Sequence, residues 1–170
     1  MSATRLDVAL ERSHQASRAA AYEATLRAGL VSVAVVVAWA DAVVAREVSP
    51  HWAFCDLALL ESRPASAVLE ALGTVEGPRE PALIEAFVAS DLLVGLSAEP
   101  HRSAFYAEMV EVLGEANALT EPALLDVAAR GWRDALEADY AVDDPQASVD
   151  RAELAGALSR ELGRAASRLG

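Results

Sequence analysis

The stretch that decides the fold class is LVSVAVVVAWA at residues 30–40. Its β-branched valines alternate well enough for a β-strand. A helix is favoured, because Gly29 can end a preceding helix and Ser32 can cap a new one. The next residues, AWADAVVA at 38–45, continue the apolar pattern at helical spacing, and the sequence offers no second strand for pairing. We therefore expect an all-α fold.

Proline punctuates the rest of the chain, each time directly after a polar or acidic residue. The pairs are Ser49-Pro50, Glu80-Pro81, Glu99-Pro100, Glu121-Pro122 and Asp144-Pro145. Proline is tolerated in the first turn of a helix, where its missing N–H has no intrahelical partner to lose. An acidic residue there also complements the helix dipole. Each pair therefore predicts the start of a helix.

These signals divide the sequence into about seven or eight helices. They are expected near residues 4–28, 32–47, 50–62, 64–72, 81–96, 100–118, 120–140 and 148–169. The clearest loops lie at 73–80 and 143–147. Because 170 residues suffice for one ordinary core, we expect a single compact irregular or orthogonal bundle that forms one domain over residues 1–170.

The basic residues and the net charge exclude several functions. All 14 basic residues are arginine, so the chain lacks the lysine of Schiff-base enzymes, of pyridoxal phosphate sites and of P-loops. The formal net charge is −12, which repels phosphate backbones and argues against nucleic-acid binding. The same charge would steer a basic protein toward this one.

The compartment is predicted from cysteine content and hydrophobicity. A single cysteine, Cys55, cannot form an intrachain disulfide, which is typical of a reducing compartment. The N-terminus lacks the basic and apolar regions of a secretory signal. The most apolar run, residues 30–40, is too short to span a bilayer. We expect a soluble cytoplasmic protein without a membrane partner.

The stretch SPHWAFCDLALL, residues 49–60, allows two interpretations. His51 and Cys55 are four residues apart, so a helix would place them on one face, where the thiol could become a nucleophile. However, Trp52, Phe54 and Leu57 make the segment apolar nearly all round, which is typical of a central helix. We therefore expect a core helix that carries Cys55 as a small buried side chain.

Three aspartates interrupt apolar runs, namely Asp41, Asp56 and Asp91. A carboxylate buried in such surroundings must be paired, hydrogen-bonded or protonated. One interpretation is a buried polar cluster that binds a metal or acts as acid and base. The other places each aspartate at the margin of a wide apolar stripe.

No motif identifies a catalytic or cofactor site. Glu11 and His14 have the spacing of metal ligands on a helix, but a di-iron bundle needs a second such pair, and the sequence has none. It also lacks a G-x-S-x-G elbow, a Gly-rich phosphate loop and paired cysteines. We expect no metal and no cofactor, and a non-enzymatic protein is favoured over an enzyme.

The segment at residues 134–150 holds six acidic residues and no basic one. Aromatic side chains within and just before it could anchor a basic protein partner. The candidate binding residues are Trp132, Asp139, Tyr140, Asp143 and Asp144. The alternative interpretation is a solvated helix end followed by a loop.

Residues 37–59, VAWADAVVAREVSPHWAFCDLAL, resemble a pattern in small all-helical bacterial proteins, some of which belong to toxin–immunity loci. In that pattern, a W-A-D helix is followed by a proline turn and a D-L-A-L helix. The resemblance implies an interaction protein rather than an enzyme. Together with the acidic charge, it favours an immunity-like or inhibitor-like module whose acidic face engages a basic partner. Two alternatives remain open: a small helical enzyme or metal-binding bundle, and an assembly protein that forms homo-oligomers.

Overall fold

The all-α prediction is confirmed, and residues 33–37 lie in a helix rather than a strand, with Ser32 as the N-cap residue. The computed structural model describes the backbone of residues 3–139 and 145–169, and the side chains of residues 11–131 and 151–169. Within these ranges it contains eight α-helices and two short 3-10 helices, with no β-strand. The chain divides into two compact units, Met1–Ile84 and Glu85–Gly170, a division that the sequence analysis does not anticipate.

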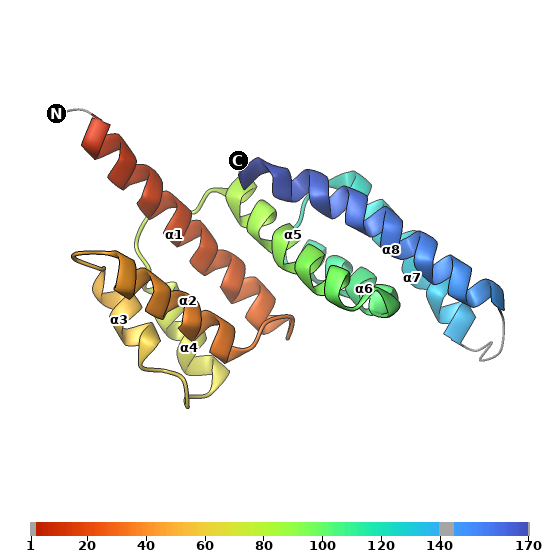
Figure 1. Cartoon of the computed structure of the whole chain (residues 1–170), viewed down its shortest axis with the longest axis horizontal. Coiled ribbons are helices and arrows are strands. Elements are labelled where there is room, and N and C mark those ends of the chain that lie inside the picture. The colour runs from red at the N-terminus through yellow and green to blue at the C-terminus, as the bar shows by residue number, and fades with distance from the viewer. Residues whose placement is uncertain (1–2, 140–144, 170) are drawn as a thin grey trace. The chain divides into compact units, whose positions relative to one another are not determined.

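The first unit contains four helices, which Figure 1 shows with the three shorter ones gathered against one side of the first. They are α1 (Ala3–Arg27), α2 (Val33–Arg46), α3 (Trp52–Ala58) and α4 (Ala65–Gly73). The first helix ends where predicted, because Gly29 follows it with φ of +74°, a conformation that glycine adopts without strain. Helix α4 packs against both α1 and α3, and α3 packs against α2.

Three aromatic rings join the helices of the first unit. The Trp39 ring on α2 lies 5.2 Å from the Tyr22 ring on α1 and 5.2 Å from the Phe54 ring on α3, measured between centroids. Phe54 and Leu57 are completely buried. Burying each such side chain contributes roughly 1.5–3 kcal/mol to folding. This core fixes α3, and with it the loop that precedes α3.

The remaining helices belong to the second unit, except that the first four residues of α5 (Pro81–Ala98), up to Ile84, fall in the first unit. The others are η1 (Pro100–Arg102), α6 (Ser103–Glu115), α7 (Pro122–Asp139), α8 (Pro145–Ala166) and η2 (Ser167–Leu169). Helices α6, α7 and α8 pack against one another, and α7 and α8 extend side by side in Figure 1. The expected start of the last helix at Ser148 is wrong, because α8 begins at Pro145, as the proline rule alone would place it.

Close helix contacts in the second unit depend on glycine. A Cβ atom on Gly95 of α5 would lie 2.6 Å from the Tyr106 hydroxyl oxygen on α6, and one on Gly114 would lie 2.6 Å from Leu125 Cδ2 on α7.

Burial raises the pKa of the Tyr106 phenol; the Glu99 carboxylate adds to the rise and the Arg102 guanidinium opposes it.

Helix α5 is long and apolar enough to cross a membrane by length and composition, and it is the one such helix among the described residues. Core helices of soluble proteins share these properties. One face of α5 is buried in the second unit, including Leu92 and Leu96, which are almost fully inaccessible. It also carries a hydrogen-bonded carboxylate, Glu85.

Candidate functional site

The structure does not support a buried cluster of Asp41, Asp56 and Asp91. Asp41 and Asp56 are exposed, which contradicts the buried-cluster interpretation for both, and Asp91 is half-buried on α5 in the other unit. Each of the two exposed aspartates lies at the margin of an apolar stripe, as the second interpretation expected. Among the described residues, no three histidine, cysteine or acidic side chains are grouped as metal ligands would be.

The candidate partner-binding residues in and just before the acidic segment at 134–150 lie partly or wholly outside the described residues. Trp132 and Asp139 belong to α7, but their side chains lie outside the described residues. Tyr140, Asp143 and Asp144 lie outside them altogether. Their assignment to a partner-binding face stays a prediction.

The burial predicted for Cys55 is wrong, because its side chain is exposed. Helix α3 is only seven residues long and buries Ala53, Phe54 and Leu57. The intervening residues Cys55 and Asp56 therefore face outward, and the flanking apolar residues Trp52 and Leu59 are exposed as well. Composition alone made this helix look central, whereas it is a surface helix with one buried face.

The exposed end of α3 borders a groove of about 1020 Å³ in the first unit. Three segments that are distant in sequence form it: α1, the loop between α2 and α3, and the loop after α4. The lining residues are Glu11, Arg12, Gln15, Glu47, Val48, Ser49, Pro50, His51, Trp52, Phe54, Glu76, Gly77 and Pro78. Among the described lining residues, three glutamates stand against one arginine and one histidine, so this part of the lining is acidic.

A buried amide fixes two of these glutamates. Gln15 of α1 is 9% exposed, and its Nε2 donates to Glu11 Oε1 at 3.3 Å and also to Glu47 Oε1. Glu47 caps the C-terminus of α2, where its N–H donates to the Val43 carbonyl. One amide therefore holds two carboxylates from two helices at the same wall of the groove.

The loop after α4 forms another part of the groove, where it packs on α1. A Cβ atom on Gly77, whose φ is +142°, would lie 2.8 Å from the Arg12 carbonyl oxygen and 3.0 Å from Ala16 Cβ. Only glycine combines this φ with such a close approach. Farther along the loop, the Glu80 N–H donates to Ser17 Oγ of α1 at 2.9 Å, and Ser13 Oγ donates to the Glu80 carboxylate.

His51, in the loop that precedes α3, lies close to Glu76 in the loop that follows α4. Its Nδ1 accepts a hydrogen bond from the Ala53 N–H at 3.3 Å and so caps α3. A nitrogen that accepts has no proton, so the Nε2 of a neutral ring carries the proton. This Nε2 faces Glu76 Oε2 at 3.7 Å. The spacing in the sequence suggested His51 as a partner for Cys55, whereas in the structure its ring caps α3.

The apolar part of the groove is open to solvent. Trp52 is 54% exposed and its ring lies 5.3 Å from that of His51, while Val48 is fully exposed. Phe54 closes the floor and is itself completely buried. Trp52 and Val48 therefore present apolar surface to solvent within the groove.

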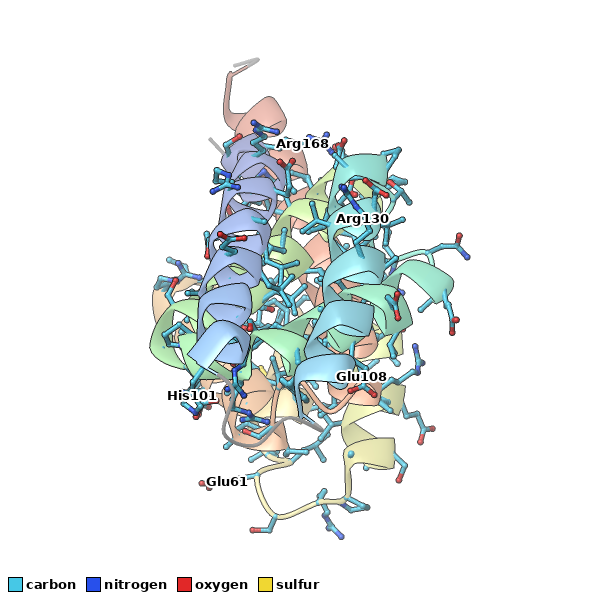
Figure 2. The ribbon with its side chains drawn as sticks, turned by 90° about the vertical axis from the view of Figure 1, so that its right-hand side faces the viewer. Glu61, His101, Glu108, Arg130 and Arg168 are labelled. Atoms are coloured by element: carbon cyan, nitrogen blue, oxygen red, sulfur yellow. The ribbon has the colours of Figure 1, made fainter. Side chains whose placement is uncertain are left out.

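A second polar cluster lies in the other unit. The carboxylate of Glu85 on α5 is 7% exposed, and its Oε1 accepts from the N–H groups of Thr120 and Glu121 at 2.7 Å each. Arg168, labelled in Figure 2, donates to Glu85 Oε2 at 2.9 Å and to Glu121 Oε2 at 2.8 Å. Because both oxygens of Glu85 are occupied, the cluster connects α5, the loop before α7 and the end of the chain, which is a structural role.

Comparison of the chain with protein-family models, curated proteins and solved structures finds no match.

Sequence reasoning missed the residues that shape the groove, chiefly Gln15, Glu47 and Glu76. One signal was available in the sequence: the Pro50 and Pro78 loops both carry an acidic residue two or three positions before the proline. No local feature of the sequence predicts that the Pro50 and Pro78 loops line the same groove beside α1.

Proposed function

We propose that the chain is a non-enzymatic protein-binding module that engages a basic segment of a partner in the groove of its first unit. The observation that carries this proposal is the combination of an exposed Trp52 with fixed acidic walls. Tryptophan is enriched among residues that dominate binding free energies, because a single side chain supplies a large apolar contact. The acidic walls would select a partner of opposite charge.

The pre-organisation of the walls supports binding over mere solvation. Glu47 is already oriented by Gln15, and His51 is oriented by the Ala53 N–H. Side chains that are ordered before binding lose less conformational entropy when the complex forms. The net charge of −12 adds a long-range field that would raise the association rate of a basic protein.

A cytoplasmic, inhibitor-like or immunity-like role accompanies this proposal. The exposed Cys55 thiol supports the compartment, because an accessible free thiol persists where glutathione keeps thiols reduced. The acidic segment around Asp139, Asp143 and Asp144 is proposed to add to the steering field.

The test begins with a photo-reactive phenylalanine analogue at position 52, which should cross-link a protein partner in cells. The same analogue at Leu59 is the control, because Leu59 is exposed just beyond the opposite end of α3 and does not line the groove. The partner, once identified and purified, is then titrated with unlabelled protein.

We expect Trp52→Ala to weaken this binding by more than about tenfold, through a faster dissociation rate. Glu47→Gln should weaken it mainly through a slower association rate at low salt. Leu59→Ala and Glu61→Gln are the matched controls; Glu61 projects from its loop in Figure 2 and lies outside the groove. Equal losses in the groove variants and their controls would contradict the proposal.

A further inference from the structure

The two carboxylates on one wall of the groove are held close together. Both Glu11 Oε1 and Glu47 Oε1 lie within hydrogen-bonding distance of the same nitrogen, Gln15 Nε2. Gln15 is neutral, so it satisfies these oxygens without cancelling their charge. Two like charges at such short range repel each other, and a cation between them would relieve that repulsion.

The geometry leaves room for a ligand to provide this cation. Gln15 engages Oε1 of each carboxylate, so Oε2 of each has capacity for a second donor. Glu11 is exposed and Glu47 is half-buried, and both line the groove. The site is therefore accessible, but one of its two carboxylates is only partly hydrated.

The form of the site favours a guanidinium over an ammonium. A guanidinium is planar and carries five N–H donors, so one group can bond two carboxylates at once. It is also more weakly hydrated than an ammonium, and it stacks on aromatic rings. Trp52 lies in the same groove with about half of its surface exposed.

We infer that the groove is an arginine-recognition site, in which a partner peptide places one guanidinium between Glu11 and Glu47 and an apolar side chain against Trp52. This inference rests on the proposed function, and it names the chemistry of the bound segment. Shape supports a peptide as the occupant. Pockets for small molecules bury most of their ligand, whereas Val48 and Glu76 on the rim of this groove are almost fully exposed.

The inference is tested with the full chain and a displayed library of random linear peptides. We expect selected peptides to be enriched in arginine together with an aromatic or aliphatic residue. A synthetic selected peptide is then compared with versions in which the arginine is replaced by citrulline or lysine. Citrulline keeps the shape without the charge, so it should bind at least about tenfold more weakly. Lysine should bind several-fold more weakly.

Variants of the wall identify the site of recognition. Glu47→Gln should remove most of the preference for arginine over citrulline, and Glu11→Gln, at an exposed position that tolerates substitution, should remove part of it. Glu61→Gln should leave the preference unchanged. Selected peptides without arginine, a failure to select any peptide, or a preference that survives both groove variants would each overturn the inference.

These outcomes are separable from those of the proposed function. If a purified protein partner loses affinity with Trp52→Ala but shows no arginine preference, the groove binds proteins and the arginine inference fails. If arginine peptides bind as expected while the protein partner ignores all groove variants, the inference holds for the site and the proposed function fails.

Discussion

Replacing Arg168 with glutamine should destabilise the second unit by about 1–2 kcal/mol. The side chain donates to Glu85 and Glu121 at 2.9 and 2.8 Å, and it is the cationic partner that the structure shows for the Glu85 carboxylate. Glutamine is shorter and neutral, so Glu85 would keep its negative charge in a site where it is only 7% exposed.

The magnitude follows from the position of this pair between two limits. Removing one partner of a fully buried ion pair costs about 3–5 kcal/mol, whereas exposed pairs contribute about 0–1 kcal/mol. Arg168 is 44% exposed, which lowers the cost, and Glu85 retains two backbone donors at 2.7 Å. The expected loss therefore lies between the two limits.

Arg130→Gln is the matched control. Arg130 pairs with Asp126 one turn earlier on α7, and both side chains are about two-thirds exposed. Figure 2 labels both arginines, so the two sites can be compared directly. Pairs of this exposed, local kind contribute at most about 0.5 kcal/mol. The same substitution should therefore cost several times more at position 168.

Urea unfolding followed by circular dichroism measures both variants under the same salt conditions. Hydrogen exchange supplies a local measurement, because the Thr120 and Glu121 amides donate to Glu85 and should exchange faster in Glu85→Gln than in Arg130→Gln. The double variant Glu85→Gln/Arg168→Gln should lose less than the sum of the single losses. Equal stability of Arg168→Gln and Arg130→Gln would refute this account of the cluster.

Three further predictions concern other regions. Cys55 should react with a thiol reagent almost as fast in the native protein as in the denatured chain, and Cys55→Ser should change stability by less than about 0.5 kcal/mol, as expected for an exposed site. Because burial raises the pKa of Tyr106, the unfolded chain loses the phenolic proton first, so stability should fall as pH rises above about 10. Tyr106→Phe should reduce that fall in alkaline urea titrations, and an unchanged fall would assign it to other groups. Replacing Asp139, Asp143 and Asp144 with asparagine should slow association with a basic partner at low salt, where electrostatic steering is strongest because it is screened within roughly 10 Å at 0.1 M salt. The unfolding midpoint should stay nearly unchanged. Stopped-flow binding across a salt series measures the association rate, and an unaltered rate would show that these residues play no part.

Helix positions were largely predictable because their signals are local. Gly29 ends α1 and Pro81 begins α5, and each acts through its own backbone preferences. The third helix was predicted too long, at residues 50–62 instead of Trp52–Ala58. There the His51 side chain supplies the cap, so Pro50 lies outside the helix rather than in its first turn.

Burial and the groove were less predictable, because they depend on contacts between distant segments. Cys55 lies between residues that are buried, and only the direction of the helix relative to its neighbours determines that it faces solvent. Gln15 and Glu47 are 32 residues apart, so neither residue type nor spacing could pair them. The same is true of Glu85 and Arg168, which are 83 residues apart.

The tight fit of Gly77 against α1 has a consequence for the evolution of this protein. A side chain at position 77 would collide with the Arg12 carbonyl oxygen, and a larger one at position 16 would push the same loop away. Natural variants should therefore keep glycine and a small residue at these two sites, or change both together. The glutamates of the groove have no comparable steric requirement, so they should vary more among natural variants. Relatives of this chain would then be easier to detect by the Ala16–Gly77 pair than by the acidic residues that give the groove its charge.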